Sequence, residues 1–196
     1  MVYDPKVHHR HSIRLAGYDY SQSGVYYVTI CTRDRVCLFG GVADGETILN
    51  DFGKTVAVSW EWLGTRYDHV ELDEWVVMPN HIHGIILIVD DDNGSQFDRR
   101  GGSRTAPTGQ RKPIGRLIGA FKTVSTKRIN ERCHTPGAIV WQRNYYEHII
   151  RDETELNRIR EYIAANPARW CKDRENPCRN PERIASTVNA TKSWKD

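Results

Sequence analysis

Residues 75–89 read WVVMPNHIHGIILIV. Two apolar runs flank Pro79 and Asn80, and a proline followed by an asparagine favours a turn. The runs ELDEWVVMP and HIHGIILIV therefore predict two strands that pair as an antiparallel hairpin. In the second strand His81 and His83 project from one face, and both faces are otherwise apolar. Such a strand is expected at the centre of a sheet that is covered on both sides.

Two further segments have the composition of strands. Residues 25–39, VYYVTICTRDRVCLF, are rich in β-branched and aromatic side chains, which pack well on a pleated surface. Residues 138–143, AIVWQR, predict a short last strand.

Three segments show the apolar spacing of helices. The first follows Asn50 or Asp51, either of which can cap it, and the second runs from about residue 114 to 133. The third follows Asp152, and Asn166 closes it before a proline. The order strand, helix, strand, strand, helix, strand, with one further helix, predicts an α+β fold. We expect a ferredoxin-like antiparallel sheet with helices packed on it, plus a C-terminal helix.

Length and composition favour one domain. The chain has 196 residues, of which 39% are hydrophobic, enough for one ordinary core. We expect this domain over residues 1–170, followed by a polar tail over residues 171–196. No apolar run is long enough to span a bilayer and no signal peptide is evident, so a cytoplasmic location without a membrane partner is expected. The five cysteines form no CxxC pair and are interpreted as reduced thiols.

Positive charge is concentrated in one segment. Residues 90–113 have the Gly, Ser, Pro and charge content of a flexible loop, and the predicted helix after it is also basic. These side chains could neutralise DNA phosphates, although charge alone leaves open a solvated loop and helix face. The candidate DNA contacts are Arg99, Arg100, Arg104, Arg111, Lys112, Arg116, Lys122 and Lys127.

The candidate chemical groups lie on two predicted elements. His81 and His83 are two residues apart on a strand, so their imidazoles can reach one metal ion. Tyr162 and Asn166 are four residues apart on the last predicted helix, which places them on one edge of it. Spacing alone also allows a structural role for all four residues.

Three blocks of sequence resemble a known family. They are SIRLAGYDYSQSGVYYVTICTRDR, WVVMPNHIHGIILIV and WQRNYYEHIIRDETELNRIREYIAANPARW. Together they are similar to the HUH transposases of bacterial insertion sequences, in particular to the REP-associated tyrosine transposases. The resemblance runs from about Ser12 to Trp170, the basic loop excepted. It implies that His81, His83 and Asn166 hold a divalent metal and that Tyr162 is the nucleophile.

The resemblance also implies the reaction and its partners. We expect a metal-dependent endonuclease and strand transferase that acts on hairpin-bearing single-stranded DNA through a covalent 5′-phosphotyrosine. Mg²⁺ or Mn²⁺ is the expected cofactor and a homodimer the expected assembly. Two alternatives stay open: a catalytically silent DNA-binding regulator with the same fold, and a metal-dependent hydrolase that uses water as its nucleophile.

Overall fold

Four antiparallel strands form the main sheet of the computed structural model, which describes residues 18–20, 22–89, 112–173 and 176–177. Their order across the sheet is β4, β5, β1 and β6. The strands are β1 (Gly24–Cys31), β4 (Val70–Met78), β5 (His81–Ile88) and β6 (Tyr146–Ile150). Because β5 lies between β4 and β1, the predicted central strand is confirmed. With helices between the strands in chain order, the predicted α+β, ferredoxin-like arrangement is also confirmed.

The predicted hairpin of β4 and β5 turns at Pro79 and Asn80. Met78 lies opposite His81, so only these two residues make the turn. Asn80 is fully buried, and its side-chain Nδ2 donates to the carbonyl oxygen of Arg35 at 2.9 Å. The backbone amide of Thr32 donates to the Asn80 carbonyl oxygen at 2.8 Å. These bonds fix the turn, and with it the start of the strand that carries both histidines.

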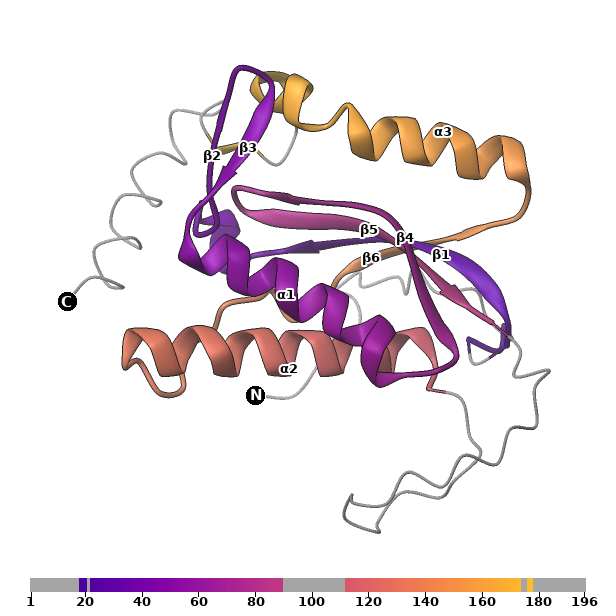
Figure 1. Ribbon diagram of the computed structural model, residues 1–196, viewed down its shortest axis with the longest axis horizontal. Helices are drawn as coiled ribbons and strands as arrows, with labels where there is room; N and C mark the ends of the chain where they lie inside the picture. The colour runs from indigo at the N-terminus through magenta and orange to yellow at the C-terminus, as the bar shows by residue number, and fades with distance from the viewer. Residues whose placement is uncertain (1–17, 21, 90–111, 174–175, 178–196) are drawn as a thin grey trace, which may run out of the picture.

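Two helices cover one face of the sheet (Figure 1): α1 (Asp51–Arg66) and α2 (Ile114–Cys133). Asn50 caps α1, since its side-chain oxygen accepts from the amides of the second and third helical residues at 3.0 Å. Trp60 of α1 and Phe121 of α2 are fully buried, with their ring centroids 5.1 Å apart. Gly84 of β5 lets Trp60 approach, because a Cβ there would lie 2.4 Å from the indole ring. The main core therefore lies between these helices and the sheet.

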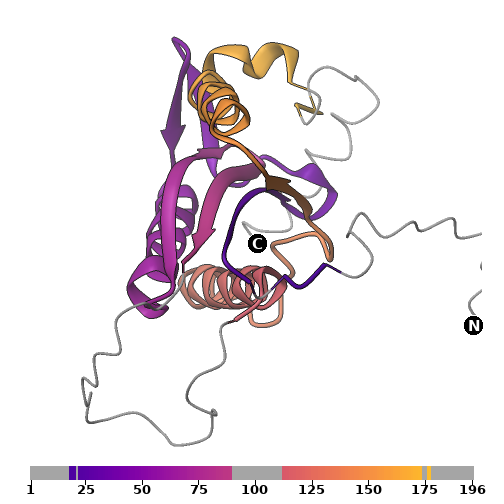
Figure 2. The same cartoon turned by 90° about the vertical axis from the view of Figure 1, so that its right-hand side faces the viewer.

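A third helix, α3 (Glu153–Ala164), lies across the opposite face (Figure 2). The Asp152 side chain caps it by accepting from the amide of Glu155 at 2.8 Å, as predicted. A second apolar cluster joins α3 to the sheet through Tyr27, Ile85, Ile150, Ile159 and Ile163. Tyr27 and Ile85 lie on the same face of the sheet as His81 and His83, because side chains alternate along a strand. The last predicted helix thus covers the histidine face.

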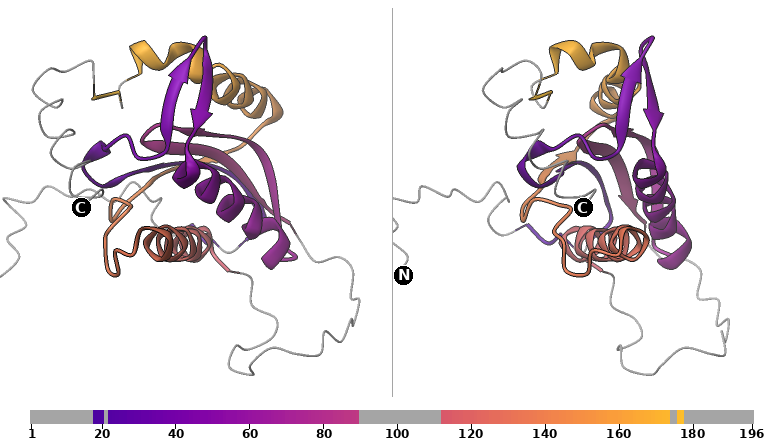
Figure 3. Two further views of the ribbon diagram at one scale, coloured as in Figure 1. Left: turned by 60° about the vertical axis from the view of Figure 1, so that its left-hand side comes forward. Right: turned by 90° about the vertical axis from the view of Figure 1, so that its left-hand side faces the viewer.

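After α3 the chain forms a short 3-10 helix, η2 (Pro167–Lys172), beside a small hairpin that the sequence did not predict (Figure 3). This hairpin consists of β2 (Gly40–Ala43) and β3 (Glu46–Leu49), and β3 contacts η2. Both strands are only four residues long. Such short strands give too little alternation to stand out in a sequence.

The first predicted strand is shorter than expected. It ends at Cys31, and a single 3-10 turn, η1 (Arg33–Arg35), follows. Asp34 and Arg35 have φ angles of 54° and 57°, in the left-handed region that breaks a strand. The apolar residues 36–39 still enter the core, where Phe39 is fully buried, but they do so outside the sheet. Three charged residues in succession turn the chain before the apolar run resumes.

The predicted last strand at residues 138–143 is wrong. Trp141 forms only an isolated bridge with Thr32, and the strand that pairs with β1 is β6 at residues 146–150. Between the two, Nζ of Lys122 donates to the carbonyl oxygens of Gln142 and Asn144 at 2.8 and 3.0 Å. These carbonyl groups are therefore directed at a helix and not along a sheet.

Two expectations from composition can be compared with the described residues. Cys31, Cys37, Cys133 and Cys171 are free thiols, in agreement with the interpretation from sequence, and Cys178 lies outside the described part. Within that same part, no helix has both the length and the apolar character needed to cross a bilayer.

Candidate metal and nucleophile site

Two buried histidines form the centre of the candidate site. The His81 side chain is fully buried and that of His83 is 3% exposed. Their Nε2 atoms lie 2.9 Å apart on the face of β5 that α3 covers. The predicted placement of both imidazoles on one face, within reach of one ion, is thus what the structure shows.

The outer nitrogen of each ring is held by a partner. Nδ1 of His81 lies 2.8 Å from Oδ1 of Asn80, and Nδ1 of His83 lies 2.8 Å from both the Tyr27 and the Thr29 hydroxyl oxygens. Because Nδ2 of Asn80 donates elsewhere, its Oδ1 accepts, so Nδ1 of His81 carries the proton. A hydroxyl oxygen can accept a hydrogen bond, so Tyr27 and Thr29 allow Nδ1 of His83 to carry the proton as well. Both Nε2 atoms then present lone pairs to one point, an arrangement that suits a shared cation.

Burial also fixes the charge of the two imidazoles. It lowers the pKa of His83 to about 3. The pKa of His81 is likewise well below its ordinary value, because of burial first and then of the neighbouring His83 and Arg35. Both rings are therefore neutral near pH 7, the state that metal ligation requires.

Asp173, which follows α3, offers an oxygen ligand beside the histidines. Oδ2 of Asp173 lies 3.8 Å from Nε2 of His81, and the donor atoms of His81, His83 and Asp173 all lie within 4.8 Å of one another. The predicted ligand Asn166 is buried, and its Oδ1 accepts no hydrogen bond from the described residues. Two neutral imidazoles with carboxylate or amide oxygen suit Mn²⁺ well, and Mg²⁺ less well. The residues therefore fit a divalent ion, with Asp173 as a ligand candidate that the sequence did not reveal.

The predicted nucleophile lies beside this pair. Tyr162 of α3 has a ring centroid 5.4 Å from that of His83, and its side chain is 42% exposed. The Tyr162 and Tyr27 rings meet edge to face at 6.3 Å. The structure thus brings a solvent-accessible hydroxyl-bearing ring to the two buried histidines, although 79 positions of chain separate Tyr162 from His83.

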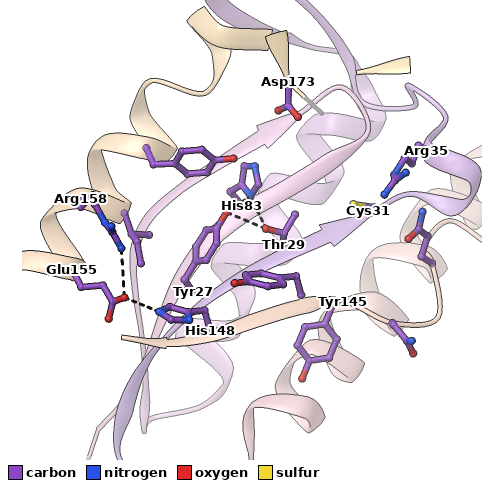
Figure 4. Close-up of a pocket in the computed structure, with 15 residues that line it drawn as sticks. Tyr27, Thr29, Cys31, Arg35, His83, Tyr145, His148, Glu155, Arg158 and Asp173 are labelled. Carbon is purple, nitrogen blue, oxygen red and sulfur yellow. Dashed lines mark hydrogen bonds and ion pairs between the residues drawn. The ribbon is translucent and has the colours of Figure 1, made fainter. Parts of the chain in front are cut away.

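A pocket of about 710 Å³ opens from these residues toward β6 (Figure 4). Its lining includes Tyr27, His83, Tyr162 and Asp173, together with side chains from the loop before β6 and from the first turns of α3. Nε2 of His148 lies 2.8 Å from Oε1 of Glu155 on the pocket wall. His148 is therefore bound to α3, and its side chain is 40% exposed.

The candidate DNA contacts are only partly described. Arg99, Arg100, Arg104 and Arg111 lie outside the described residues. Lys112, Arg116 and Lys127 are exposed, but α2 covers the face of the sheet opposite to the histidines. Lys122 is half-buried and uses its ammonium group to bind the loop before β6. Two arginines that sequence reasoning missed, Arg35 and Arg158, line the pocket itself.

Comparison with known proteins identifies relatives of the chain. No family model matches it. It is 40% identical over 183 residues to an uncharacterised protein of Haemophilus influenzae, covering 87% of this chain and 95% of that protein. It is 21% identical to a predicted REP-associated tyrosine transposase of Haemophilus influenzae, over 77% of this chain and 74% of that protein. A solved REP-associated tyrosine transposase bound to a REP hairpin matches with a TM-score of 0.52 and 18% identity, over 80% of this chain and 74% of that one.

The fold is therefore that of the REP-associated tyrosine transposases, and the resemblance inferred from the three sequence blocks is confirmed. The chain belongs to one family with the Haemophilus influenzae protein to which it is 40% identical.

Proposed function

We propose that the protein is a metal-dependent single-stranded DNA endonuclease and strand transferase of the transposase type, with Tyr162 as its nucleophile. The observation that carries this proposal is the position of Tyr162, half-exposed and 5.4 Å from the ring of buried His83. A phosphate group that reaches the two histidines would also meet the tyrosine. The relatives named as REP-associated tyrosine transposases support the same function.

The proposed step is a transfer of one phosphate ester bond. The Tyr162 hydroxyl oxygen forms a bond to phosphorus, and the bond from phosphorus to the 3′ oxygen breaks. The tyrosine proton ends on that 3′ oxygen, so the products are a 5′-phosphotyrosine and a free 3′-hydroxyl. Because the new bond is still a phosphate ester, the 3′-hydroxyl of another strand can reverse the step without ATP.

The residues around Tyr162 supply positioning and charge. His81 and His83 stay neutral and can hold a divalent ion, which when bound would polarise a non-bridging phosphate oxygen. Burial raises the pKa of the Tyr27 hydroxyl above its ordinary value and outweighs the hydrogen bond from Thr29, which lowers it. The neighbouring Tyr162, through its charge and its hydrogen bond, raises the pKa further. Tyr27 therefore keeps its proton near pH 7 and can donate to the Tyr162 oxygen, which positions the nucleophile.

Replacement of the nucleophile tests the proposal. Tyr162→Phe should abolish the covalent protein–DNA adduct, by at least about 100-fold, while DNA affinity stays within about twofold, because only the attacking oxygen is lost. The measurement is denaturing gel electrophoresis after incubation with single-stranded DNA and Mn²⁺. Tyr146→Phe is the matched control on the same pocket and should form the adduct. Adduct formation by Tyr162→Phe would place the nucleophile elsewhere. Cleavage without any adduct in the wild type would favour the hydrolase.

Hairpin-bearing single-stranded DNA is the substrate we propose. The solved relative is bound to a REP hairpin, and this chain has its fold. Assembly as a homodimer is a prediction of the resemblance, and analytical ultracentrifugation at micromolar concentration tests it. A sedimentation coefficient that corresponds to one chain at every concentration would contradict the dimer.

We also propose that the basic segment contacts phosphates, which has a measurable consequence in salt. Each lost contact should lower the slope of log affinity against log salt by about 0.7 for a single strand. Replacing Arg99, Arg100, Arg104 and Arg111 together with serine should therefore flatten the slope by up to about 2.8, the sum of four contacts. An unchanged slope would show that the segment is solvated and that other residues bind the DNA.

A further inference from the structure

The pocket is larger than the proposed reaction centre needs. Its volume is about 710 Å³, and pockets of about 300–1,000 Å³ hold whole drug-sized ligands. From His83 and Tyr162 it extends over β1 to β6, the edge strand of the sheet. Tyr146 lines the β6 side of the pocket, and the proposed bond transfer does not use it. This side therefore has room for a ligand group beyond the phosphate.

Tyr146 is a large aromatic residue left half-open to solvent. Its side chain is 49% exposed, although the pocket has a buried wall. Its ring meets that of Tyr27 edge to face, with centroids 6.1 Å apart, and Tyr27 in turn meets Tyr162 at 6.3 Å. The three rings thus form a row from α3 over β1 to β6. Tyr27 is only 8% exposed and supports the two accessible rings on either side.

The loop before Tyr146 is held in place by a lysine of α2. Nζ of Lys122 donates to the carbonyl oxygens of Gln142 and Asn144 at 2.8 and 3.0 Å, and it lies 5.5 Å from the ring centroid of Tyr145. The backbone before β6 is therefore fixed by contacts within the protein. A pre-positioned aromatic surface loses little conformational freedom when it binds a ligand.

Positive charges stand at opposite ends of the same pocket (Figure 4). Arg158 lies at the α3 end and Arg35 at the far end, beyond Cys31. The Arg158 side chain is 77% exposed and lies 3.7 Å from Glu155, a carboxylate that His148 also binds. The carboxylates of Glu155 and Asp173 also line the pocket, so the two arginines are local positive charges and the pocket as a whole is not cationic. Exposed aromatic rings beside an arginine that reaches solvent are a combination that binds single-stranded nucleic acid.

We propose that Tyr146 is the stacking platform for one nucleobase of single-stranded DNA, next to the phosphate that Tyr162 attacks, and that Arg158 contacts the strand's backbone. This inference rests on the proposed function, because a strand enters the pocket only if the pocket is a DNA site. Since every base has a flat π face, the platform tolerates different sequences.

The test compares strands with and without bases. Fluorescence anisotropy measures binding of a labelled short oligothymidylate and of an abasic deoxyribose-phosphate strand of the same length, in EDTA so that no strand is cut. Tyr146→Ala should weaken oligothymidylate binding about 5- to 150-fold, the loss expected for one stacked base, and leave binding of the abasic strand unchanged. Tyr146→Phe keeps the ring and should bind both strands as the wild type does. Arg158→Gln should weaken both strands equally.

Ile48→Ala is the matched control, because Ile48 is 61% exposed but lies on the β2–β3 hairpin outside this pocket. It should leave both affinities unchanged, and thermal unfolding checks that each variant is folded. Wild-type affinity of Tyr146→Ala for oligothymidylate, or an equal loss on the abasic strand, overturns the platform. The binding assay involves no cleavage, so its result does not depend on whether Tyr162 forms an adduct. If the wild type forms the adduct but Tyr146→Ala binds oligothymidylate normally, only the stacking proposal is rejected.

Discussion

At the scale of single residues, period-two spacing was enough to place the two histidines but not their partners. His81 and His83 must share a face if they lie on one strand. Tyr27 and Thr29 bind Nδ1 of His83 only because Thr29 pairs with His83 across β1 and β5. That register depends on how the whole sheet aligns, so no local pattern in the sequence shows it. The metal-ligand hypothesis was therefore available from sequence, and the two hydroxyl groups that orient the ring were not.

The buried histidines should make the metal-free protein acid-sensitive. Below about pH 6.5 an imidazole in the unfolded chain binds a proton, whereas His83, whose pKa is held at about 3 by burial, stays neutral in the folded state. Proton binding then favours the unfolded chain. The contribution of the neutral, buried histidine to the free energy of unfolding is therefore fully present above about pH 6.5 and is lost as the pH drops toward about 3. We expect the free energy of unfolding to fall by up to about 1.4 kcal/mol per pH unit for each buried histidine.

Urea denaturation in EDTA between pH 7 and about pH 5 measures this slope, since most carboxylates titrate at lower pH. His83→Gln should remove about half of it. His134→Asn is the control, because His134 is exposed and asparagine tolerates its left-handed φ of 55°. The same slope in wild type and His83→Gln would contradict the prediction.

At the scale of elements, long periodic segments were predicted and short irregular ones were not. The helices after Asn50, at residues 114–133 and after Asp152 all form, because their apolar spacing and caps are local features. The strand expected at residues 138–143 does not form, since Lys122 binds the carbonyl groups that a strand would use. A contact between a helix and a loop twenty residues away is a tertiary effect that a local pattern cannot show.

The position of α3 depends on one ion pair as well as on its apolar residues. Nε of Arg160 donates to Oδ2 of Asp73 on β4 at 3.0 Å, and Nη2 reaches the same carboxylate. Arg160→Met should weaken this attachment, since the pair is bidentate, but only modestly because it is partly exposed. We expect α3 to open up to about fivefold more often. Tyr162 lies two residues further along α3, and adduct formation should stay near the wild-type rate because the closed form of α3 still predominates.

Hydrogen exchange of the α3 amides, compared with those of α1, measures the opening. Arg132→Met is the matched control, because it breaks an exposed ion pair between Arg132 and Asp51 that does not involve α3. It should leave exchange in α3 unchanged. Equal α3 protection in wild type and Arg160→Met would mean that the apolar cluster alone holds the helix.

At the scale of the whole molecule, the site joins segments that are distant in the sequence. The histidines come from β5, the tyrosine from α3, and Asp173 from the chain after η2, within the region expected to be a polar tail. Nothing in the sequence distinguishes Asp173 from other acidic residues, because its role depends on how α3 and η2 return the chain to β5. Trp170, whose ring centroid lies 6.0 Å from that of His81, was the last residue of the recognised block and marks where the chain comes back.

The oxygen ligand is the part of the proposed metal site that the whole fold decides, and metal-induced stabilisation can identify it. Any ion that binds only the folded protein raises its melting temperature. Asp173→Ala removes a charged oxygen 3.8 Å from His81, so it should weaken Mn²⁺ binding by about tenfold or more and abolish most of the stabilisation. Asn166→Ala should weaken binding less, because water can replace a neutral amide oxygen. Glu131→Gln on α2 is the control for loss of one carboxylate and should respond to Mn²⁺ as the wild type does.

The measurement is the melting temperature across a Mn²⁺ titration, with His83→Ala as the variant that binds least. If Asp173→Ala is stabilised as strongly as the wild type while Asn166→Ala is not, the amide is the ligand, as the family resemblance implies, and Asp173 only neighbours the site.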